Sequence, residues 1–342
     1  MISIIMPAYN EEKFIRNAVT SILKQTCRDF ELLVVDDGST DATGKILQEL
    51  CRQDRRIKGY TQKNAGVSAA RNRALTNAKG DFVTMADADD ALPPDALETL
   101  LSFMGKGVDL VIGSHEGVKG RAVPAFKKPA RYEAHEIVQH FDAVDPCLYF
   151  PWAKLYRRSV IVQNHLQFDP GISFGEDHIF NLHYVGVMSG AAVVTDQIVY
   201  RYFYLRGGLC SKYYDNMNQL QKAVLLCVRN YLDTRKSGAE KCREHETGTY
   251  LTGCFNYYLA WLPLKKAEQK IRETLLLFSN LLSENLYSSF FTMHQREMLQ
   301  KGQYHSFAVA YRRGHFRDTL IRKYRRKCRM LLENAIRRDF GK

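Results

Sequence analysis

The chain has 342 residues, of which 45% are hydrophobic and 25% are charged, so it can fill a sizeable core and is not a disordered protein. Its net charge of +12 is concentrated in residues 311–342, where twelve Lys or Arg residues accompany three Asp or Glu residues. The eight cysteines form no C-x-x-C pair, which argues against a zinc ribbon, and we predict neither a signal peptide nor a membrane-spanning segment.

The first 115 residues alternate short apolar segments with segments of helical, 3.6-residue periodicity. We expect strands at 2–6, 30–35, 57–61, 82–87 and 109–114, and helices at 11–25, 41–51, 68–78 and 95–104. This alternation predicts an α/β fold of the Rossmann-like type, with a mostly parallel sheet and helices on both faces. Ligands of such sheets bind beyond the carboxyl ends of the strands, so the polar segments after the strands should meet at one edge.

The pattern changes after these first units. We expect a loop at 116–135 and renewed order at 152–162. A helix should follow at 174–183 and strand structure at 191–201. From about Asp215 the periodicity is helical throughout. We therefore predict two domains, an α/β domain over residues 1–212 and a mainly α-helical region over residues 213–342 that ends in a basic amphipathic tail.

An acidic run at residues 87–90, with the sequence DADD, directly follows an apolar strand. Magnesium and manganese ions prefer oxygen ligands and often share them with substrate phosphates, so carboxylates in this place indicate a cation that neutralises a diphosphate. The alternative is an acidic turn that caps the next helix, because Asp is common in turns and caps and two prolines follow at once.

Five short motifs occur in one order along the chain. They are PAYNE at 7–11, VDDGSTD at 35–41, NAGVSAARN at 64–72, DADD at 87–90 and GED at 175–177. This series resembles the family 2 glycosyltransferases of the GT-A fold, and the resemblance covers roughly residues 1–215. It implies a GT-A domain and a bacterial type of enzyme that uses a nucleotide sugar.

The resemblance also implies which residues bind the nucleotide sugar. Asp37 matches a carboxylate that accepts a hydrogen bond from uracil, and an ionised carboxylate, which only accepts, suits that N–H group. Gly66 precedes a helix whose N-terminus favours a phosphate, and Arg71 in its first turn is expected to reach the diphosphate, with a solvated helix face as the alternative. The other implied donor-binding residues are Pro7, Ala8, Tyr9, Glu11, Asn64, Asp87 and Ala88.

Metal binding and catalysis are implied by the same resemblance. Asp89 is expected to ligate Mn²⁺ or Mg²⁺, the cofactor that bridges the two phosphates and stabilises the departing nucleoside diphosphate. Asp177 is the expected base that takes the proton from the acceptor hydroxyl in an inverting transfer, and Glu176 competes for this role. Trp152, Glu176 and Arg206 are assigned to the acceptor side, although Trp152 fits a core tryptophan equally well.

The C-terminal segment 311–342 combines apolar residues at helical spacing with many Lys and Arg residues. This pattern is typical of a helix that lies on an anionic membrane surface. The alternatives are a helix packed on its own domain and self-association into a homo-oligomer. Enzymes that resemble this chain often use lipid-linked acceptors, so we expect a cytoplasmic protein at the inner face of the plasma membrane.

The sequence thus predicts an inverting glycosyltransferase that moves a sugar from a UDP-sugar to a hydroxyl of a glycan or lipid-linked acceptor, in cell-surface polysaccharide synthesis. A nucleotidyltransferase with a similar sheet is the alternative enzyme. Such enzymes typically carry a Gly-rich basic segment just after the first strand, and residues 7–12 contain neither Gly nor Lys. An oxidoreductase is disfavoured because no G-x-G-x-x-G follows the first strand. A nucleic-acid-binding protein would explain the basic tail and not the carboxylates, so we expect no nucleic-acid partner.

Overall fold

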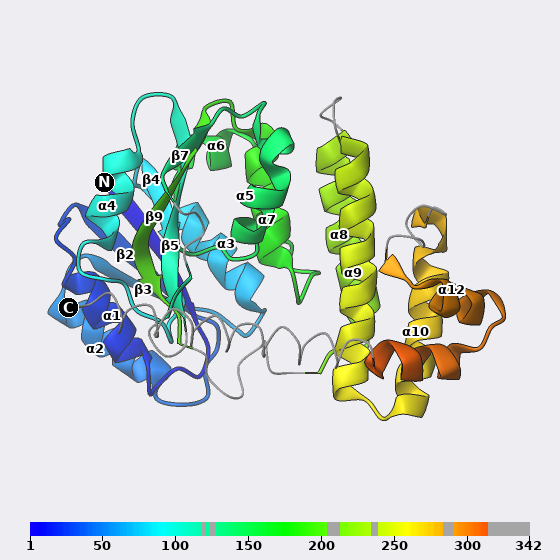
Figure 1. Ribbon diagram of the computed structural model, residues 1–342. Coiled ribbons are helices and arrows are strands. Elements are labelled where there is room, and N and C mark those ends of the chain that lie inside the picture. The colour runs from blue at the N-terminus through cyan, green and yellow to red at the C-terminus, as the bar shows by residue number, and fades with distance from the viewer. Residues whose placement is uncertain (118–120, 124–127, 204–212, 234–238, 283–289, 314–342) are drawn as a thin grey trace, which may run out of the picture. The chain divides into compact units, whose positions relative to one another are not determined.

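The computed structural model describes residues 1–117, 121–123, 128–203, 213–233, 239–282 and 290–313. The chain divides into two compact units, one formed by residues 1–212 and 223–243 and the other by residues 213–222 and 244–342. The first unit is α/β and the second is helical where it is described, so the predicted fold class is confirmed (Figure 1).

A single nine-stranded sheet forms the centre of the first unit, in the order β3-β2-β1-β4-β8-β5-β9-β7, with β6 paired to β5. Its strands are β1 Ile2–Ala8, β2 Phe30–Asp36, β3 Ile57–Thr61, β4 Phe82–Met85, β5 Val108–Gly117, β6 Arg121–Val123, β7 Ala130–Tyr132, β8 Lys154–Arg157 and β9 Ala191–Arg201. The pairs among β1 to β4 are parallel, and so is the pair of β5 and β9. Strand β8 runs antiparallel between β4 and β5, so the sheet is mixed in its second half.

The strand register decides where the polar loops leave the sheet. Ala8 at the end of β1 pairs with Asp36 at the end of β2, which in turn pairs with Thr61 at the end of β3. Ile5 of β1 pairs with Met85, the last residue of β4. The loops that follow these four parallel strands therefore emerge at one edge of the sheet, as the sequence predicts.

Helices cover both faces of this sheet, α1, α2 and α4 on one face and α3, α5 and α7 on the other (Figure 1). The helices of the first unit are α1 Ile15–Leu23, α2 Thr43–Gln53, α3 Val67–Asn77, α4 Ala96–Phe103, η1 Ile137–His140, α5 Phe141–Leu148, α6 Arg158–Gln163 and α7 Glu176–Val187. In α1 the apolar positions Ile15, Ala18, Val19 and Ile22 are buried, so its 3.6-residue pattern faces the core. Burial of that stripe fixes the loop between β1 and α1.

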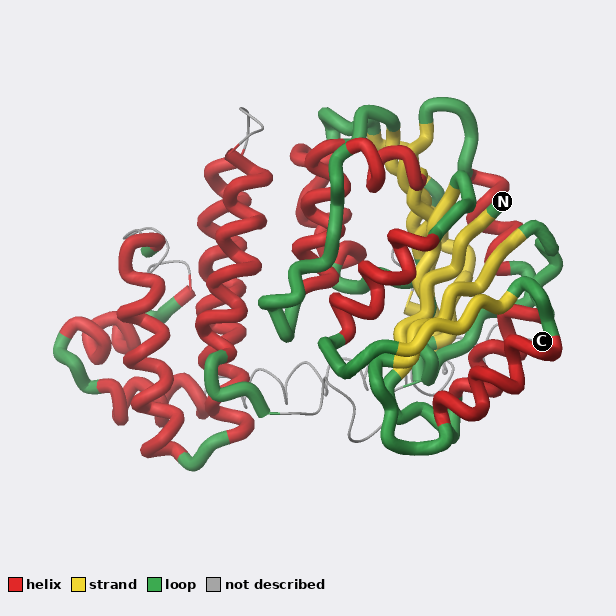
Figure 2. The backbone as a smooth tube through the Cα atoms, turned by 180° about the vertical axis from the view of Figure 1, so that it is seen from behind, coloured by secondary structure: helices red, strands yellow, loops and turns green. Residues whose placement is uncertain are grey.

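The second unit contains helices and loops, and Figure 2 shows no strand in its described part. Its helices are the first turns of α8 Met217–Asp233, most of α9 Ala239–Trp261, and α10 Leu264–Phe278, η3 Ser279–Leu281 and α12 Met293–Gln300. Buried aromatic residues such as Phe255, Tyr258 and Phe278 fill its core. In the described part of the chain, no helix is both long and apolar enough to cross a bilayer.

Two parts of the fold differ from the sequence prediction. The expected loop at 116–135 contains the end of β5 and the strands β6 and β7, which are short and belong to the border of the sheet. No helix was predicted between 136 and 151, where η1 and α5 form. The pattern is obscured there because α5 contains Pro146, a residue that normally argues against a helix interior.

Candidate active site

The loops after β1 and β2 are locked together by side chains of both. The backbone N–H of Asn10 donates to the Ser39 hydroxyl at 2.9 Å, and the Asn10 side-chain oxygen accepts from the backbone N–H of Thr40 at 2.8 Å. Asn10 can do this because it holds a left-handed conformation with φ +58°, which Asn tolerates better than most residues. The Glu11 N–H donates to Thr43 at 2.7 Å, so the carboxylate of Glu11 starts from a fixed backbone.

Asp37 holds the loop that follows β3. Its carboxylate accepts hydrogen bonds from the Gln62 side chain at 2.8 Å and from the backbone N–H groups of Ala65 at 2.9 Å and Gly66 at 2.8 Å. Gly38 lies so close to this loop that a Cβ there would be 2.7 Å from the Asn64 nitrogen. A carboxylate offers about four acceptor positions, of which these bonds occupy three, and Asp37 is only 3% exposed. Its role toward uracil therefore stays a prediction.

The remaining predicted donor-binding residues of these loops differ in exposure. Tyr9 is 47% exposed, so its ring is open to a ligand, whereas Ala8 is buried at the end of β1. Asn64 and Gly66 are exposed, and Gly66, with φ +90°, is the N-cap residue of α3. Pro7 is half-buried beside them in β1. The structure thus brings these residues to one edge of the sheet, although no finding tests their contact with a nucleotide.

Carboxylates of the β1 and β4 loops repel one another electrostatically. Burial, together with the nearby charges of Asp89, Asp41 and Asp87, raises the pKa of Glu11 to about 7. Burial and the charge of Asp87 likewise raise the pKa of Asp89 to about 6. Negative groups that hold on to protons in this way are stabilised by a cation placed among them.

Asp90 serves as an anchor inside the same acidic run. Its two carboxylate oxygens accept from the Tyr200 hydroxyl and from the Phe203 N–H, each at 2.8 Å. The Tyr200 hydroxyl in turn accepts from the Asp87 N–H at 3.0 Å. Burial, and next the charge of Asp87, raises the pKa of Asp90 to about 8. Asp90 therefore fixes the acidic loop to β9. Tyr200 takes part in this contact, and sequence reasoning missed it.

The fit of a divalent cation rests on these oxygen atoms. Among the described residues, no three His, Cys, Asp or Glu side chains are close enough together to hold a metal ion by themselves. Asp89 and its neighbours supply hard carboxylate oxygens, which suit Mg²⁺ or Mn²⁺, but too few of them for a complete shell. A cation would complete its shell with diphosphate oxygens and water, which is how Mg²⁺ commonly binds with nucleotides.

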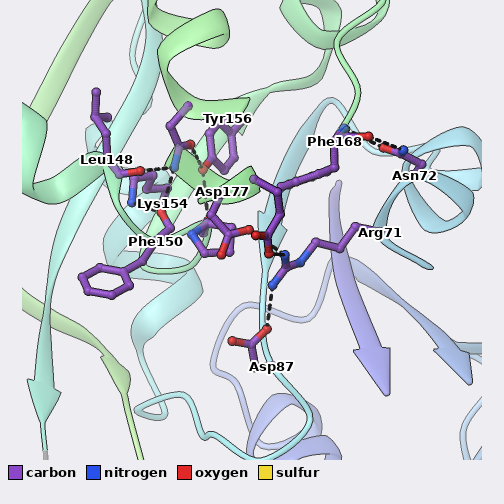
Figure 3. Close-up of polar contacts among 12 residues, drawn as sticks. Arg71, Asn72, Asp87, Leu148, Phe150, Lys154, Tyr156, Phe168 and Asp177 are labelled. Carbon is purple, nitrogen blue, oxygen red and sulfur yellow. Dashed lines mark hydrogen bonds and ion pairs between the residues drawn. The ribbon is translucent and has the colours of Figure 1, made fainter. Parts of the chain in front are cut away.

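Arg71 connects the acidic loop to α7 (Figure 3). Its guanidinium donates to Asp87 at 3.3 Å, to Glu176 at 3.2 Å and to Asp177 at 2.5 Å, and its side chain is only 4% exposed. The alternative of a solvated helix face is therefore wrong for Arg71. Because the single guanidinium of Arg71 is shared by three carboxylates, the cluster keeps an excess of negative charge. Contact of Arg71 with a diphosphate stays a prediction.

The predicted base lies in the first turn of α7, a helix that starts at the motif GED. Gly175 is the N-cap residue, with φ +86°, and Glu176 and Asp177 follow it. The helix dipole stabilises negative charge at these positions. Burial raises the pKa of Asp177 well above its usual value, against the opposing charge of Arg71. Glu176 is more buried, with 10% of its side chain exposed against 20% for Asp177.

A second network fixes the segment beside α7. Lys154 is buried in β8, and its ammonium donates to the carbonyl oxygens of Phe150 at 2.6 Å and Trp152 at 3.3 Å. Burial lowers the pKa of Lys154 to about 8. The Asn181 side-chain amide also donates to the Phe150 carbonyl, at 2.9 Å. Sequence reasoning missed Lys154, and a lone charged residue in the apolar segment 152–156 was the signal available for finding it.

The acceptor-side prediction for Trp152 needs correction. The indole is 3% exposed, and the rings of Phe150 and Tyr200 stack on it with centroids 4.4 Å and 4.5 Å away. It belongs to the core and has no open face for a sugar, because neighbouring aromatic rings already cover it. Phe150, 39% exposed, is the accessible ring of this stack. Arg206, the other acceptor-side prediction besides Glu176, lies outside the described residues.

Comparisons with known proteins identify the family of the N-terminal part of the chain. Residues 3–163 match the model for glycosyl transferase family 2. This part of the chain belongs to that family. The family resemblance predicted from the five motifs is thereby confirmed.

Curated relatives are longer than the segment they share with this chain. The glycosyltransferase GlyA of Streptococcus pneumoniae is 34% identical over 61% of this chain and 31% of its own length. The uncharacterized glycosyltransferase EpsJ of Bacillus subtilis is 32% identical over 53% of this chain and 55% of its own. The match thus spans about half or less of these relatives, so it identifies a shared domain and leaves the activity of this chain to be proposed.

A solved structure shares the architecture of both units. The crystal structure of S. aureus TarS residues 1–349 in complex with UDP-GlcNAc superimposes with a TM-score of 0.70 over 92% of each chain, at 24% identity. At that identity the comparison establishes the fold and nothing further.

Proposed function

We propose that this chain is an inverting glycosyltransferase that moves a sugar from a UDP-sugar to a hydroxyl group of a glycan or lipid-linked acceptor, with Mn²⁺ or Mg²⁺, in the synthesis of a cell-surface polysaccharide. The observation that carries the proposal is the cluster in which Arg71 joins Asp87 of the acidic loop to Asp177 at the start of α7. It unites the donor-binding edge of the sheet with a carboxylate of raised pKa.

Donor binding is assigned to the loops after β1, β2 and β3. The exposed Tyr9 offers an aromatic face to the base, and Asp37 has an acceptor position left for an N–H group. The exposed N-terminus of α3 beside Gly66 favours the diphosphate. TarS, whose fold is similar, was crystallised with UDP-GlcNAc, which supports a uridine nucleotide as the class of donor to test first.

Asp89 would hold the cation, with Glu11 and Asp87 contributing negative charge around it. When bound, the cation supplies Lewis-acid stabilisation of the negative charge on the leaving diphosphate. The raised pKa values of Glu11 and Asp89 imply that cation binding competes with protons, so donor affinity should fall as the pH drops from about 7 to 5.

Asp177 is assigned to deprotonate the acceptor. A carboxylate oxygen of Asp177 would take the hydroxyl proton as the acceptor oxygen attacks the anomeric carbon from the side opposite the leaving group. Its raised pKa brings the carboxylate closer to the basicity that proton transfer at neutral pH requires. Arg71 holds this side chain in place through the ion pair from α3.

The test compares Asp177→Asn with Glu176→Gln in assays of nucleotide binding and of sugar transfer. A panel of UDP- and GDP-sugars with manganese is first screened for thermal stabilisation, because a bound nucleotide raises the melting temperature by mass action. We expect Asp177→Asn to keep this stabilisation and to lose transfer by about 10²–10⁴-fold, the usual contribution of a general base. Near-normal transfer in Asp177→Asn together with loss in Glu176→Gln would assign the base to Glu176 instead.

Asp89→Ala tests the cation site separately. We expect the variant to lose the manganese-dependent part of donor binding, while Asp95→Ala keeps it, because Asp95 is an exposed N-cap residue of α4 whose side chain makes no cap hydrogen bond. Manganese-dependent stabilisation of unchanged size in Asp89→Ala would remove this residue from cation binding.

Membrane association is assigned to residues 311–342, of which 314–342 lie outside the described residues. Each basic residue near an anionic leaflet contributes about 1 kcal/mol, so the excess of Lys and Arg would hold the enzyme at the cytoplasmic face. A cut after Arg313 is preferable to an earlier one, because Tyr311 packs on Phe255 and Phe307. The shortened chain should lose binding to phosphatidylglycerol vesicles, and the full chain should lose it at high salt. Binding that survives the cut refutes the assignment.

A further inference from the structure

The helical unit contains a polar hollow of about 300 Å³ between the start of α8 and the middle of α10, which we call the helical hollow. Its lining includes Asp215, Asn216, Gln219, Lys270 and Glu273. Amides, carboxylates and an ammonium group together offer both donors and acceptors of hydrogen bonds. A ligand rich in hydroxyl groups, each of which donates and accepts, matches such a lining.

The charges of the helical hollow disfavour an anion. The Lys270 ammonium is paired with Asp215 at 2.8 Å and with Glu273 at 3.3 Å, so its positive charge is already compensated. Two carboxylates and one ammonium leave a net charge of about −1 at neutral pH. The charge of the lining residues therefore favours a neutral molecule over a phosphate or an acidic lipid headgroup.

An aromatic surface adjoins the helical hollow. The rings of Tyr213 and Tyr257 stack with centroids 5.9 Å apart, and Trp261 lies 6.1 Å from each. Tyr213 is 36% exposed and Trp261 is 46% exposed. The Tyr213 hydroxyl donates to a carboxylate oxygen of Asp215 at 3.1 Å, which connects the aromatic surface to the hollow. Exposed aromatic rings beside polar groups present a flat apolar face with hydrogen-bonding partners at its edge.

The surrounding backbone is fixed before any ligand arrives. The Tyr258 hydroxyl donates to the Asp215 carbonyl at 3.1 Å and accepts from the Asn218 N–H at 3.0 Å. The Tyr257 hydroxyl accepts from the Tyr214 N–H at 2.5 Å. These bonds join the first turn of α8 to α9, so little ordering entropy is lost when a ligand binds.

We propose that the helical hollow and its aromatic surface form a binding site for a neutral oligosaccharide. One pyranose ring lies with its C–H face on Trp261, whose plane is tilted 42° from that of Tyr213, and hydroxyl groups of the neighbouring ring bond to Gln219, Asn216 and Glu273. The site belongs to the helical unit and is separate from the proposed donor site. It would hold a glycan chain independently of the transfer reaction.

The experiment uses the two tryptophans of the full chain, which differ sharply in exposure. Trp152 is 3% exposed and Trp261 is 46% exposed, so acrylamide quenching of the fluorescence reports mainly on Trp261. The probes are chitotetraose, cellotetraose, maltotetraose and mannotetraose, each at about 10 mM, which saturates a site with a Kd of about 1 mM. We expect at least one of them to lower the quenching constant about twofold, since stacking covers most of an indole face.

Matched variants show whether the protection arises in the helical hollow. Gln219→Ala should weaken the protective sugar about fivefold, whereas Gln300→Ala, an exposed glutamine of α12 outside the hollow, should leave it unchanged. Glu273→Gln serves as a second variant of the lining. Asp177→Asn should keep the full protection, because the donor site is not involved.

Several results would overturn the proposal. They are an unchanged quenching constant with all four sugars, equal protection in wild type and Gln219→Ala, and protection lost in Asp177→Asn. Quenching that falls as the protein concentration rises, without sugar, would show that a second copy of the chain covers Trp261, and this also refutes the proposal. A failure here leaves the transfer assays of Asp177→Asn unaffected, so the two proposals are tested independently.

Discussion

Replacement of Arg71 by methionine tests whether one guanidinium holds the candidate active site together. Arg71 is 4% exposed and pairs with Asp87, Glu176 and Asp177, whose side chains are 29%, 10% and 20% exposed. Met has a similar length and no charge, so the variant leaves three nearby carboxylates without their shared cation. Breaking a buried ion pair from one side costs about 3–5 kcal/mol, since the charges left behind are poorly solvated.

The assay is thermal unfolding of the α/β unit, followed by the fluorescence of Trp152 in a Trp261→Phe background. For a unit of this size each kcal/mol lowers the melting temperature by about 2–4 °C, so Arg71→Met should unfold about 6–20 °C lower. Arg73→Met is the matched control on the same helix. The Arg73 guanidinium donates to the Thr61 carbonyl and lies over the Tyr60 ring, and its loss should cost about 1 kcal/mol or less.

The deficit of Arg71→Met should also depend on pH. Burial already holds the pKa of Asp177 above its usual value, and the charge of Arg71 opposes that rise. Without the guanidinium, the pKa of Asp177 rises further above that of the unfolded chain, so the folded state binds more protons than the unfolded state. Stability of the variant then falls as the pH rises, and its deficit against wild type should be smaller at pH 5 than at pH 8. A loss of no more than about 1 kcal/mol, the size expected of an exposed pair, or a deficit independent of pH, would refute this interpretation of the cluster.

Other predictions concern positions outside the cluster. Gly175→Ala should destabilise the α/β unit by about 2 kcal/mol or more, because φ is +86° and a Cβ would lie 2.5 Å from Val224. Gly253 lies in a helix with open space around it, so Gly253→Ala should stabilise the protein by about 0.5–1 kcal/mol. Equal melting temperatures for the two variants would contradict this prediction. Glu31 is buried, which raises its pKa, but Lys58 and backbone bonding outweigh this and lower it. Its contribution to stability is therefore present above about pH 4.5 and is lost at lower pH. In urea titrations, the unfolding free energies of Glu31→Gln and wild type should differ at pH 7 and converge near pH 3. A difference that stays constant with pH would be inconsistent with the ion pair.

The alternating elements of the first 115 residues were predictable because each carries a local signal. Strands β1 and β2 consist mostly of apolar residues, and α1 shows four apolar positions at helical spacing. Helix α5 was missed because its proline contradicts the local rule, and only packing in the tertiary structure holds it. Strands β6 and β7 were missed because strands of three residues carry too little pattern.

The candidate site was predictable only where a residue type alone indicates chemistry. The acidic run and the motif GED could be located, and parallel topology implied that the loops after the strands meet. The partners of these residues were not predictable, because Arg71 and Asp177 are 106 positions apart in the chain. Distance along the chain also hid the core position of Trp152, because the Tyr200 ring that stacks on it comes from β9.

The sequence by itself determined the layered α/β class, the family and the identity of the acidic side chains, because periodicity, residue type and motif order are local properties. The tertiary structure decided which charges share one guanidinium, which aromatic ring is covered and which is open, and which polar groups gather in the helical hollow. Such properties depend on contacts between distant segments. Burial and neighbouring charge then shift the pKa values and the accessibility on which binding and catalysis depend.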